Sequence, residues 1–366
     1  MSVEVHPTIN EFSSDQWNSL VNENNPFNKW EFYRALEIGN CIGKNTGWSP
    51  LYFAAFNENK EITATSVLFL KTDSYGEFIF DWDWAQAYQQ YQVPYYPKLT
   101  CAIPYSPITA PKLLGDEEVI SSELLPEIWS FYQKNGFSGI HFLFTEVRDN
   151  KLLQEYDLSL RDSFQYHWHN TDLESFDDYL SSLSRNKRKS IKRERRDVSK
   201  LSLDIVLKTG ADITPEDIEF FFECYLTTID KKWSQAYLTR EFFKELFSTM
   251  PEHCLLFIAS DELGPAASSL FLQSETTLFG RYWGCVREHE FLHFELCLYQ
   301  GLEYAIENKL KVFEAGAQGE HKRIRGFEPL ITHSLHHLKH PQFNAAIKDF
   351  VLREREGIKE LFEKHF

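Results

Sequence analysis

The chain has 366 residues, of which 43% are hydrophobic, 16% aromatic and 25% charged, and this composition excludes a disordered, collagen-like or disulfide-scaffold protein. The 54 Asp and Glu residues outnumber the 38 Lys and Arg residues, which gives a net charge of −16. Such a chain repels phosphate polymers on average, so any anion-binding surface must be local. The length predicts two domains.

No apolar run is long enough to span a bilayer, and the first residues lack the basic and apolar stretches of a signal peptide. The six cysteines form no C-x-x-C pair. We therefore expect a cytoplasmic protein with reduced thiols. Cys285 lies in an aromatic segment, where it could be a nucleophile or a small buried core residue.

The first half of the chain alternates between helical and strand patterns. In chain order the patterns predict two short helices within Trp17–Glu37, strands at Leu51–Phe56 and Thr63–Lys71, a strand beginning in Glu77–Trp84, an irregular segment at Pro94–Pro111, a helix at Glu117–Asn135, a strand at Gly139–Phe144 and a helix at Lys151–Tyr156. The irregular segment is a candidate binding loop.

The second half repeats this order. It predicts helices at Phe176–Lys200, Pro215–Asp230, Thr239–Ser248 and Phe291–Asn308, and strands at Leu203–Leu207, Cys254–Ser260, Ala266–Gln273, Thr276–Trp283 and Val312–Ala315. The fold class is therefore mixed α/β, with two similar halves in tandem.

Positive charge is concentrated in residues 185–196, where eight Lys and Arg residues accompany a single acidic residue, Glu194, for a local charge of +7. A helix of this kind is either a solvated face or a phosphate-binding surface. The candidate donor phosphate-binding residues are Lys187, Arg188, Lys192 and Arg195. No aromatic residue interrupts the run, so base stacking is not expected there.

Titratable residues crowd the segment Val312–Phe327, in which the turn glycines Gly316 and Gly319 allow the backbone to approach a ligand. His321 is the candidate base, with Glu314 or Glu320 as its orienting partner, and Lys322 and Arg325 are candidate anion binders. Gln318 in the same turn is a candidate substrate-binding residue. The alternative is a tight turn with surface ion pairs.

Further candidate substrate-binding residues lie near a strand end and in aromatic segments, where they either line a ligand cleft or belong to the core or the helix surface. They are Trp82, Tyr105, His167, His169, Trp233, Arg281, Tyr282, Trp283, His293 and Glu295. The histidines at 333, 336, 337 and 340 alternate with leucines at helical spacing and have no nearby cysteine, so no metal site is predicted.

Five segments in order resemble the FemAB-like predicted N-acyltransferases, a family named for peptidoglycan biosynthesis or recognition. They read YYPKLTCAIPYSPITAPKLL at 95–114, HWHNTDLESFDDYLSSLSRNKRKSIKRERR at 167–196, FGRYWGC at 279–285, LHFELCLYQGLEYAIE at 292–307 and FEAGAQGEHKRIRGFEP at 313–329. The resemblance implies two tandem acetyltransferase-like (GNAT) domains with a cleft between them, which we place at residues 1–165 and 166–366, the second containing the basic helix.

The resemblance also implies transfer of an acyl or aminoacyl group to an amine acceptor, such as a cell-envelope precursor. In the better-known Fem enzymes the donor is aminoacyl-tRNA, held partly by a basic helical segment. Here no helical hairpin arm follows Lys200, and the Gln/Arg-x-x-Gly-x-Gly/Ala signature for acyl-CoA is missing. The donor therefore stays open between aminoacyl-tRNA and acyl-CoA, each as a co-substrate, with no tightly bound cofactor. The alternatives are an acyl-CoA-dependent N-acetyltransferase of small molecules and a non-catalytic protein that binds a peptidoglycan-type ligand.

Overall fold

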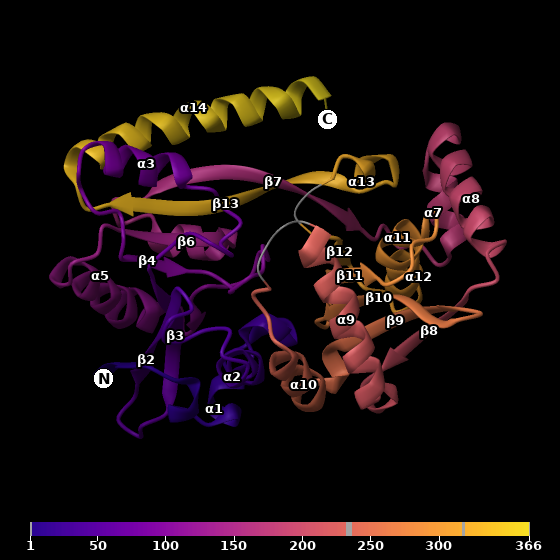
Figure 1. Ribbon diagram of the computed structural model, residues 1–366. Coiled ribbons are helices and arrows are strands. Elements are labelled where there is room, and N and C mark those ends of the chain that lie inside the picture. Colours follow the sequence, from indigo (N-terminus) through magenta and orange to yellow (C-terminus); the bar gives the residue numbers. More distant parts are fainter. Residues whose placement is uncertain (1, 232–235, 317–318, 366) are drawn as a thin grey trace. The chain divides into compact units, whose positions relative to one another are not determined.

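A computed structural model describes residues 2–231, 236–316 and 319–365 (Figure 1). The chain forms two compact units. Unit 1 consists of residues 1–22, 27–164 and 331–366, and unit 2 of residues 23–26 and 165–330. No helix in the described ranges combines the length and the apolar content that a membrane span needs.

The sheet of unit 1 has four antiparallel strands in the order β1-β2-β3-β4, then β6 parallel to β4, then β13 antiparallel to β6, with the first part of β7 next to β13. The short β5 pairs with β3. The strands are β1 (Ser2–His6), β2 (Trp48–Phe56), β3 (Ile62–Lys71), β4 (Lys98–Cys101), β5 (Leu114–Gly115), β6 (Gly139–Thr145), β7 (Ser159–His169) and β13 (Glu328–Leu338).

Unit 2 repeats this topology. Its strands β8, β9, β10 and β11 are antiparallel, β12 is parallel to β11, and the second part of β7 is antiparallel to β12. The strands are β8 (Asp204–Thr209), β9 (Cys254–Asp261), β10 (Gly264–Gln273), β11 (Thr277–Cys285) and β12 (Val312–Glu314). The predicted mixed α/β fold with two similar halves is confirmed.

The helical connection between the two parallel strands has the same unusual form in both units. Each is a short α-helix, a five-residue π-helix and a longer α-helix, and π-helical turns are rare in proteins. In unit 1 these are α4 (Glu117–Val119), η4 (Ile120–Leu124) and α5 (Leu125–Lys134), and in unit 2 they are α11 (Leu292–Phe294), η7 (Glu295–Tyr299) and α12 (Gln300–Glu307). The match supports an internal duplication.

The other helices complete the two units. In unit 1 they are α1 (Ser14–Asn18), α2 (Trp30–Ile38), α3 (Trp82–Gln90), α6 (Val147–Leu153) and α14 (Pro341–His365), and in unit 2 they are α7 (Phe176–Ser182), α8 (Arg185–Ser199), α9 (Pro215–Lys231), α10 (Arg240–Thr249) and α13 (His321–Ile324). The core of unit 1 packs Leu125, Ile128 and Tyr132 of α5 against apolar side chains of the sheet.

The observed division differs from the predicted boundary at residue 165/166 in two respects. Residues 23–26 group with unit 2, and the C-terminal segment groups with unit 1. The chain returns to unit 1 at residue 331, because β13 pairs with β6 and α14 follows it. The sequence analysis had placed residues 331–366 in the second domain, but they belong to unit 1.

Four predicted elements also differ from the structure. The strand predicted in Glu77–Trp84 is an irregular segment followed by α3, and the helix predicted over Phe176–Lys200 is interrupted between α7 and α8. The histidines at 333, 336 and 337 lie on β13, where His336 is buried and His333 and His337 are half-buried. Consecutive buried residues of this strand, Ser334 to His336, show that it is covered on both faces, which removes the simple alternation of a half-exposed strand. The segment predicted to be irregular, Pro94–Pro111, contains β4.

The opening between the parallel strands is occupied by the chain itself in unit 1. The Lys112 amine donates to the carbonyl oxygens of Ala110 (2.6 Å) and Phe144 (2.9 Å), the latter on β6. The Sγ of Cys101 at the end of β4 lies 3.9 Å from the Lys112 carbonyl oxygen. Residues 110–112 thus lie between the ends of β4 and β6.

Close packing of α9 on β11 depends on Gly284. A Cβ atom at this position would lie 1.6 Å from the Cys224 carbonyl oxygen and 2.2 Å from its carbon, both backbone atoms of α9. We expect Gly284→Ala to destabilise unit 2 by at least about 3 kcal/mol, because neither backbone can yield. Thermal unfolding checks this against Gly136→Ala, where a Cβ meets nothing within 4 Å. Equal melting temperatures for the two variants would contradict the packing argument.

Candidate functional site

In unit 2 the sheet opens between its two parallel strands. Thr277–Phe279 of β11 pair with Val312–Glu314 of β12, and β11 then continues beyond this pairing to Cys285. The register of β11 against β10 also shifts between Gly280 and Tyr282, so that Arg281 is an extra residue in the strand. Such bulges redirect side chains and are frequent beside active sites. Arg281, Tyr282 and Trp283 therefore lie where β11 has left β12.

Glu314 and His167 are cross-strand neighbours on β12 and β7 at this opening. Both are buried, with 3.9 Å between Glu314 Oε1 and His167 Nδ1. His167 Nε2 is 3.2 Å from the Gln165 side-chain oxygen. Burial, aided by the charge of Lys322, lowers the pKa of His167 to about 3, so the ring is neutral at physiological pH. His169, two residues further on, is exposed.

Lys322 is a buried amine near the end of β12. Its Nζ donates to the Gly316 carbonyl oxygen at 2.6 Å, and its side chain is only 4% exposed. A Cβ at Gly316 would lie 3.8 Å from the Gly280 carbonyl oxygen of β11 and 3.9 Å from this Nζ, so the amine is near both strands. Burial lowers the pKa of Lys322 to about 8, so it loses its proton near physiological pH.

His321 lies in a row of rings. Its ring centroid is 5.6 Å from Phe294 and 6.3 Å from His293, and His293 is 5.3 Å from Trp283 on β11. Burial, together with the positive charges of Lys322 and Arg325, lowers the pKa of His321 below its ordinary value. The predicted partners are elsewhere: Glu314 faces His167, and Glu320 is exposed at the start of α13.

Gly319 fits this arrangement for two reasons. Its backbone has a φ of +124°, which side-chain-bearing residues rarely adopt. A Cβ there would also lie 2.2 Å from Cε1 of His321, because the imidazole ring folds back over the glycine. The sequence identified this glycine as a turn residue, and the structure adds that it makes room for the ring.

Arg325 connects three parts of unit 2. Its Nη2 donates to Glu194 of α8 at 2.7 Å, its Nε to the Tyr299 hydroxyl at 2.7 Å and its Nη1 to the His321 carbonyl oxygen at 2.8 Å. The guanidinium carbon also lies 3.6 Å from the centroid of the Phe294 ring. Tyr299 in turn donates to Glu194. These contacts engage every nitrogen of the guanidinium with the protein.

The basic helix α8 has two faces. Ile191, Glu194 and Val198 are buried, whereas Lys187, Arg188 and Lys192 lie on the outer side, half-buried or exposed. A pocket of about 720 Å³ adjoins α8, and it is lined by both apolar and charged residues, the latter including Lys192 and Arg196. Outward cations of this kind can contact phosphates directly.

Arg195 differs from the other predicted phosphate-binding residues. Its guanidinium bonds Glu295 (3.0 Å) and Glu303 (2.8 Å), and its carbon lies 4.5 Å from the centroid of the Phe176 ring. Glu295, a predicted substrate-binding residue, is thus paired with the basic helix. Both carboxylates line the 720 Å³ pocket with Arg195.

The remaining predicted residues are distributed over both units. Tyr282 packs against Tyr225 and Phe243, with ring centroids 5.4 and 5.8 Å apart, in the core of unit 2. In unit 1, Tyr105 is buried with its hydroxyl bonded to the Cys41 carbonyl oxygen at 2.7 Å, and Trp82 is exposed. The predictions for Trp233 and Gln318 lie outside the described residues.

Cys285 ends β11 and is half-buried. Burial raises the pKa of its thiol, the opposite of what an activated nucleophile needs. This favours the core interpretation of the residue.

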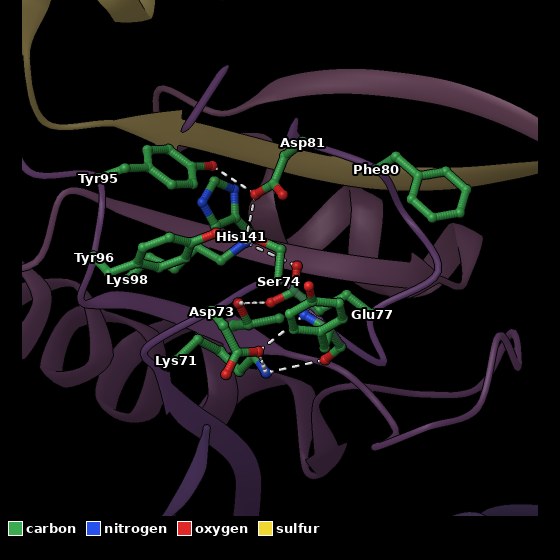
Figure 2. A network of polar contacts seen from close by, with 12 residues as sticks. Lys71, Asp73, Ser74, Glu77, Phe80, Asp81, Tyr95, Tyr96, Lys98 and His141 are labelled. Atoms are coloured by element: carbon green, nitrogen blue, oxygen red, sulfur yellow. Dashed lines mark hydrogen bonds and ion pairs between the residues drawn. The ribbon is translucent and has the colours of Figure 1, made fainter. Parts of the chain in front are cut away.

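Two groups of residues were not identified as important from the sequence. Glu194 and Tyr299 hold Arg325, and the signal for Glu194 was its isolation as the single acidic residue in the basic run. The second group is a buried polar network around Lys98 in unit 1 (Figure 2). Its carboxylates alternate with aromatic residues, which resembles the pattern of an ordinary strand.

The two halves of the sheet repeat one topology, in which a helical connection joins a parallel strand pair, and the second half has a buried amine at its opening. This is the fold of the tandem acetyltransferase-like (GNAT) class. The FemAB-like family model, described by peptidoglycan biosynthesis or recognition, matches residues 8–365. The chain therefore belongs to the FemAB-like family and is a transferase.

Solved structures support the fold. A structure of FemX is 11% identical with a TM-score of 0.56, covering 95% of this chain and all of that chain. The C-terminal domain of a putative lysylphosphatidylglycerol synthetase from Agrobacterium fabrum is 7% identical with a TM-score of 0.57, covering 93% and 96%. L-PGS from Bacillus licheniformis is 9% identical with a TM-score of 0.52, covering 88% and 96%. No curated protein sequence matches the chain.

The buried pair of Arg325 and Glu194 leads to a stability prediction. Glu194→Ala leaves a guanidinium uncompensated in the interior, so we expect it to cost about 3–5 kcal/mol of unfolding free energy. Glu303→Ala removes a more exposed partner of Arg195, which retains Glu295, and we expect a loss of about 1 kcal/mol or less. Urea unfolding of both variants measures the difference, and similar midpoints would contradict the assigned role of Glu194.

Proposed function

We propose that this transferase moves an aminoacyl group from aminoacyl-tRNA to an amine on a cell-envelope precursor. The observation that carries the proposal is the buried Lys322 amine beside the opening between β11 and β12, in the same unit as the basic helix α8. Membership of the FemAB-like family supports an acceptor from peptidoglycan synthesis. Aminoacyl-tRNA is a cytoplasmic molecule, in accord with the location expected from the sequence.

The chemistry requires a base and a cation. The acceptor amine attacks the ester carbonyl carbon of the donor, and His321 accepts a proton from the attacking nitrogen. The Lys322 ammonium stabilises the oxyanion that forms as the carbonyl π bond opens. When the intermediate collapses, the ester C–O bond breaks, and the leaving ribose hydroxyl takes the proton back from His321.

The neighbouring groups have supporting roles in this proposal. His167 and Glu314 flank the opening, and the neutral His167 ring adds no positive charge beside Lys322. Arg281 and Trp283, on the stretch of β11 that has parted from β12, are placed to contact the acyl part of the donor. Holding the reactants close together in the reactive orientation supplies much of the rate enhancement in reactions of this type.

A second donor, acyl-CoA, is favoured by one observation. The bulged end of β11 beyond its pairing with β12 presents backbone groups that a linear thioester could contact. The basic helix would then bind only the few phosphates of the nucleotide. The step is otherwise the same, with a thiolate leaving in place of the ribose hydroxyl.

The pH dependence of transfer tests the roles of His321 and Lys322. As the pH increases, we expect the rate to rise when His321 loses its proton, which happens below the ordinary pKa of histidine. The rate should fall again at about pH 8, where Lys322 loses its proton. Lys322→Arg should move the alkaline limb upward because arginine stays charged, whereas Lys322→Met should lose most activity at every pH. An alkaline limb unchanged in Lys322→Arg would remove Lys322 from the mechanism.

The donor is tested by binding across a salt series. We expect the wild type to bind total aminoacylated tRNA, and a variant with Lys187, Arg188 and Lys192 changed to Glu to lose both affinity and about 2–3 units of salt slope. Arg195 is left unchanged, since it holds Glu295 and Glu303.

A variant with exposed Arg353, Lys359 and Lys364 of α14 changed to Glu carries the same charge change and should bind like the wild type. Absence of tRNA binding at low salt, together with turnover of acyl-CoA, would replace the first donor by the second.

A further inference from the structure

Four of the exposed aromatic side chains in the described part of unit 1 lie in one segment, outside the site of unit 2. The segment Ser74–Trp82 joins β3 to α3, and its residues largely alternate between buried and exposed. The exposed members are Tyr75 (60%), Phe78 (39%), Phe80 (59%) and Trp82 (41%), called the aromatic face below. Large apolar side chains exposed within one short segment, two of them in ring contact, mark binding sites more often than scattered exposed residues do.

A buried lysine holds this segment from beneath. Lys98 is fully buried on β4, and its amine donates to Ser74 (2.9 Å), to Glu77 (2.8 Å) and to Asp81. Figure 2 shows this amine among the three acceptors, with Phe80 directed away from them. Burial of Asp81 opposes ionisation, but the Lys98 charge outweighs it and lowers the Asp81 pKa to about 2, so the ion pair persists at physiological pH.

The backbone of the aromatic residues is also fixed. The Tyr75 carbonyl oxygen accepts from Lys71 Nζ at 3.2 Å and from Trp48 Nε1 at 3.0 Å. The Phe80 carbonyl oxygen accepts from Arg161 at 3.0 Å. The rings of Tyr75 and Trp82 lie 5.2 Å apart at an interplanar angle of 62°. The aromatic face is therefore held in place before any ligand arrives, which lowers the entropic cost of binding.

This arrangement inverts the usual distribution of side chains. A segment selected for stability would bury its rings and expose its carboxylates, because buried ion pairs seldom stabilise more than apolar packing does. Here Glu77 and Asp81 are inside, and the rings are outside. The inversion is explained if the exposed rings have a ligand.

The surrounding charges define that ligand. Residues 72–97 contain no lysine or arginine, and Arg161, which donates to the Phe80 carbonyl oxygen, is paired with Glu354 at 2.7 Å. Both features disfavour phosphates and anionic lipid surfaces as ligands. The exposed side chains of α3 next to Trp82 are Asp83, Gln86, Gln89 and Gln90, all acceptors and mostly neutral. A ligand with flat C–H faces for the rings and hydroxyl groups for the amides matches both features.

We infer that the aromatic face binds a saccharide. The sugar rings stack on Phe80 and Trp82, and their hydroxyls pair with the amides of α3. The inference rests on the proposed function only in identifying this saccharide as the sugar part of the cell-envelope acceptor. Binding itself needs neither a donor nor turnover.

The test is calorimetric titration of the full-length protein with a tetrasaccharide of N-acetylglucosamine, without any donor. We expect the wild type to bind and the double variant Phe80→Ala, Trp82→Ala to bind at least about tenfold more weakly. Both side chains are exposed, so the variant should fold. The control is Leu263→Ala, Leu352→Ala, which removes two exposed apolar side chains elsewhere (76% and 54%) and should bind like the wild type.

Three results would overturn the inference. The first is no binding by the wild type at millimolar saccharide, and the second is equal binding by the aromatic double variant. The third is co-sedimentation of the wild type with neutral phosphatidylcholine vesicles, lost in the double variant, without saccharide binding. Saccharide binding by a wild type that transfers nothing would contradict the proposed function alone.

Discussion

The functional part of unit 2 depends on a single buried ion pair, between Arg325 and Glu194. Two charges taken out of water are stable only together, so neither segment that supplies them can shift without exposing or isolating a charge. Glu194 fixes the basic helix, and Arg325 fixes the turn that carries His321 and Lys322. The residues proposed to bind an anion and those proposed to act in the reaction are thereby held in one geometry by a contact that has no part in the proposed chemistry.

The duplicated topology shows how the two units have diverged. In unit 1 the π-helix between the parallel strands begins and ends with the buried, apolar Ile120 and Leu124, and Lys112 is bonded to β6. In unit 2 the corresponding ends of the π-helix are Glu295 and Tyr299, both committed to polar contacts with the basic helix. The ends of the π-helix are therefore part of the apolar core in unit 1, whereas in unit 2 they carry polar groups.

The sequence was sufficient for the fold class, most strands and the two segments that carry charge, because these depend on local periodicity and composition. The sequence could not predict the environment of a residue whose contact partner lies far away in the chain. The alternation in Glu77–Trp84 resembles a strand, yet it arises because Lys98 draws the carboxylates inward. β13 was missed because its histidines pair with β6, nearly 200 residues earlier, and no local pattern records that partner. Likewise, the roles of Glu194 and Tyr299 become apparent only from their contacts with Arg325.

The return of the chain to unit 1 at residue 331 has a consequence for biosynthesis. Unit 2 is almost continuous in sequence, so it can close as soon as its last strand leaves the ribosome. Unit 1 must wait with the edge of β6 unpaired until β13 is made, on the order of ten seconds or more at usual rates of translation. An unpaired edge is a site for misassociation during that interval. The first domain to be started is therefore the last to be finished, and its nascent form is the one for which a chaperone matters most.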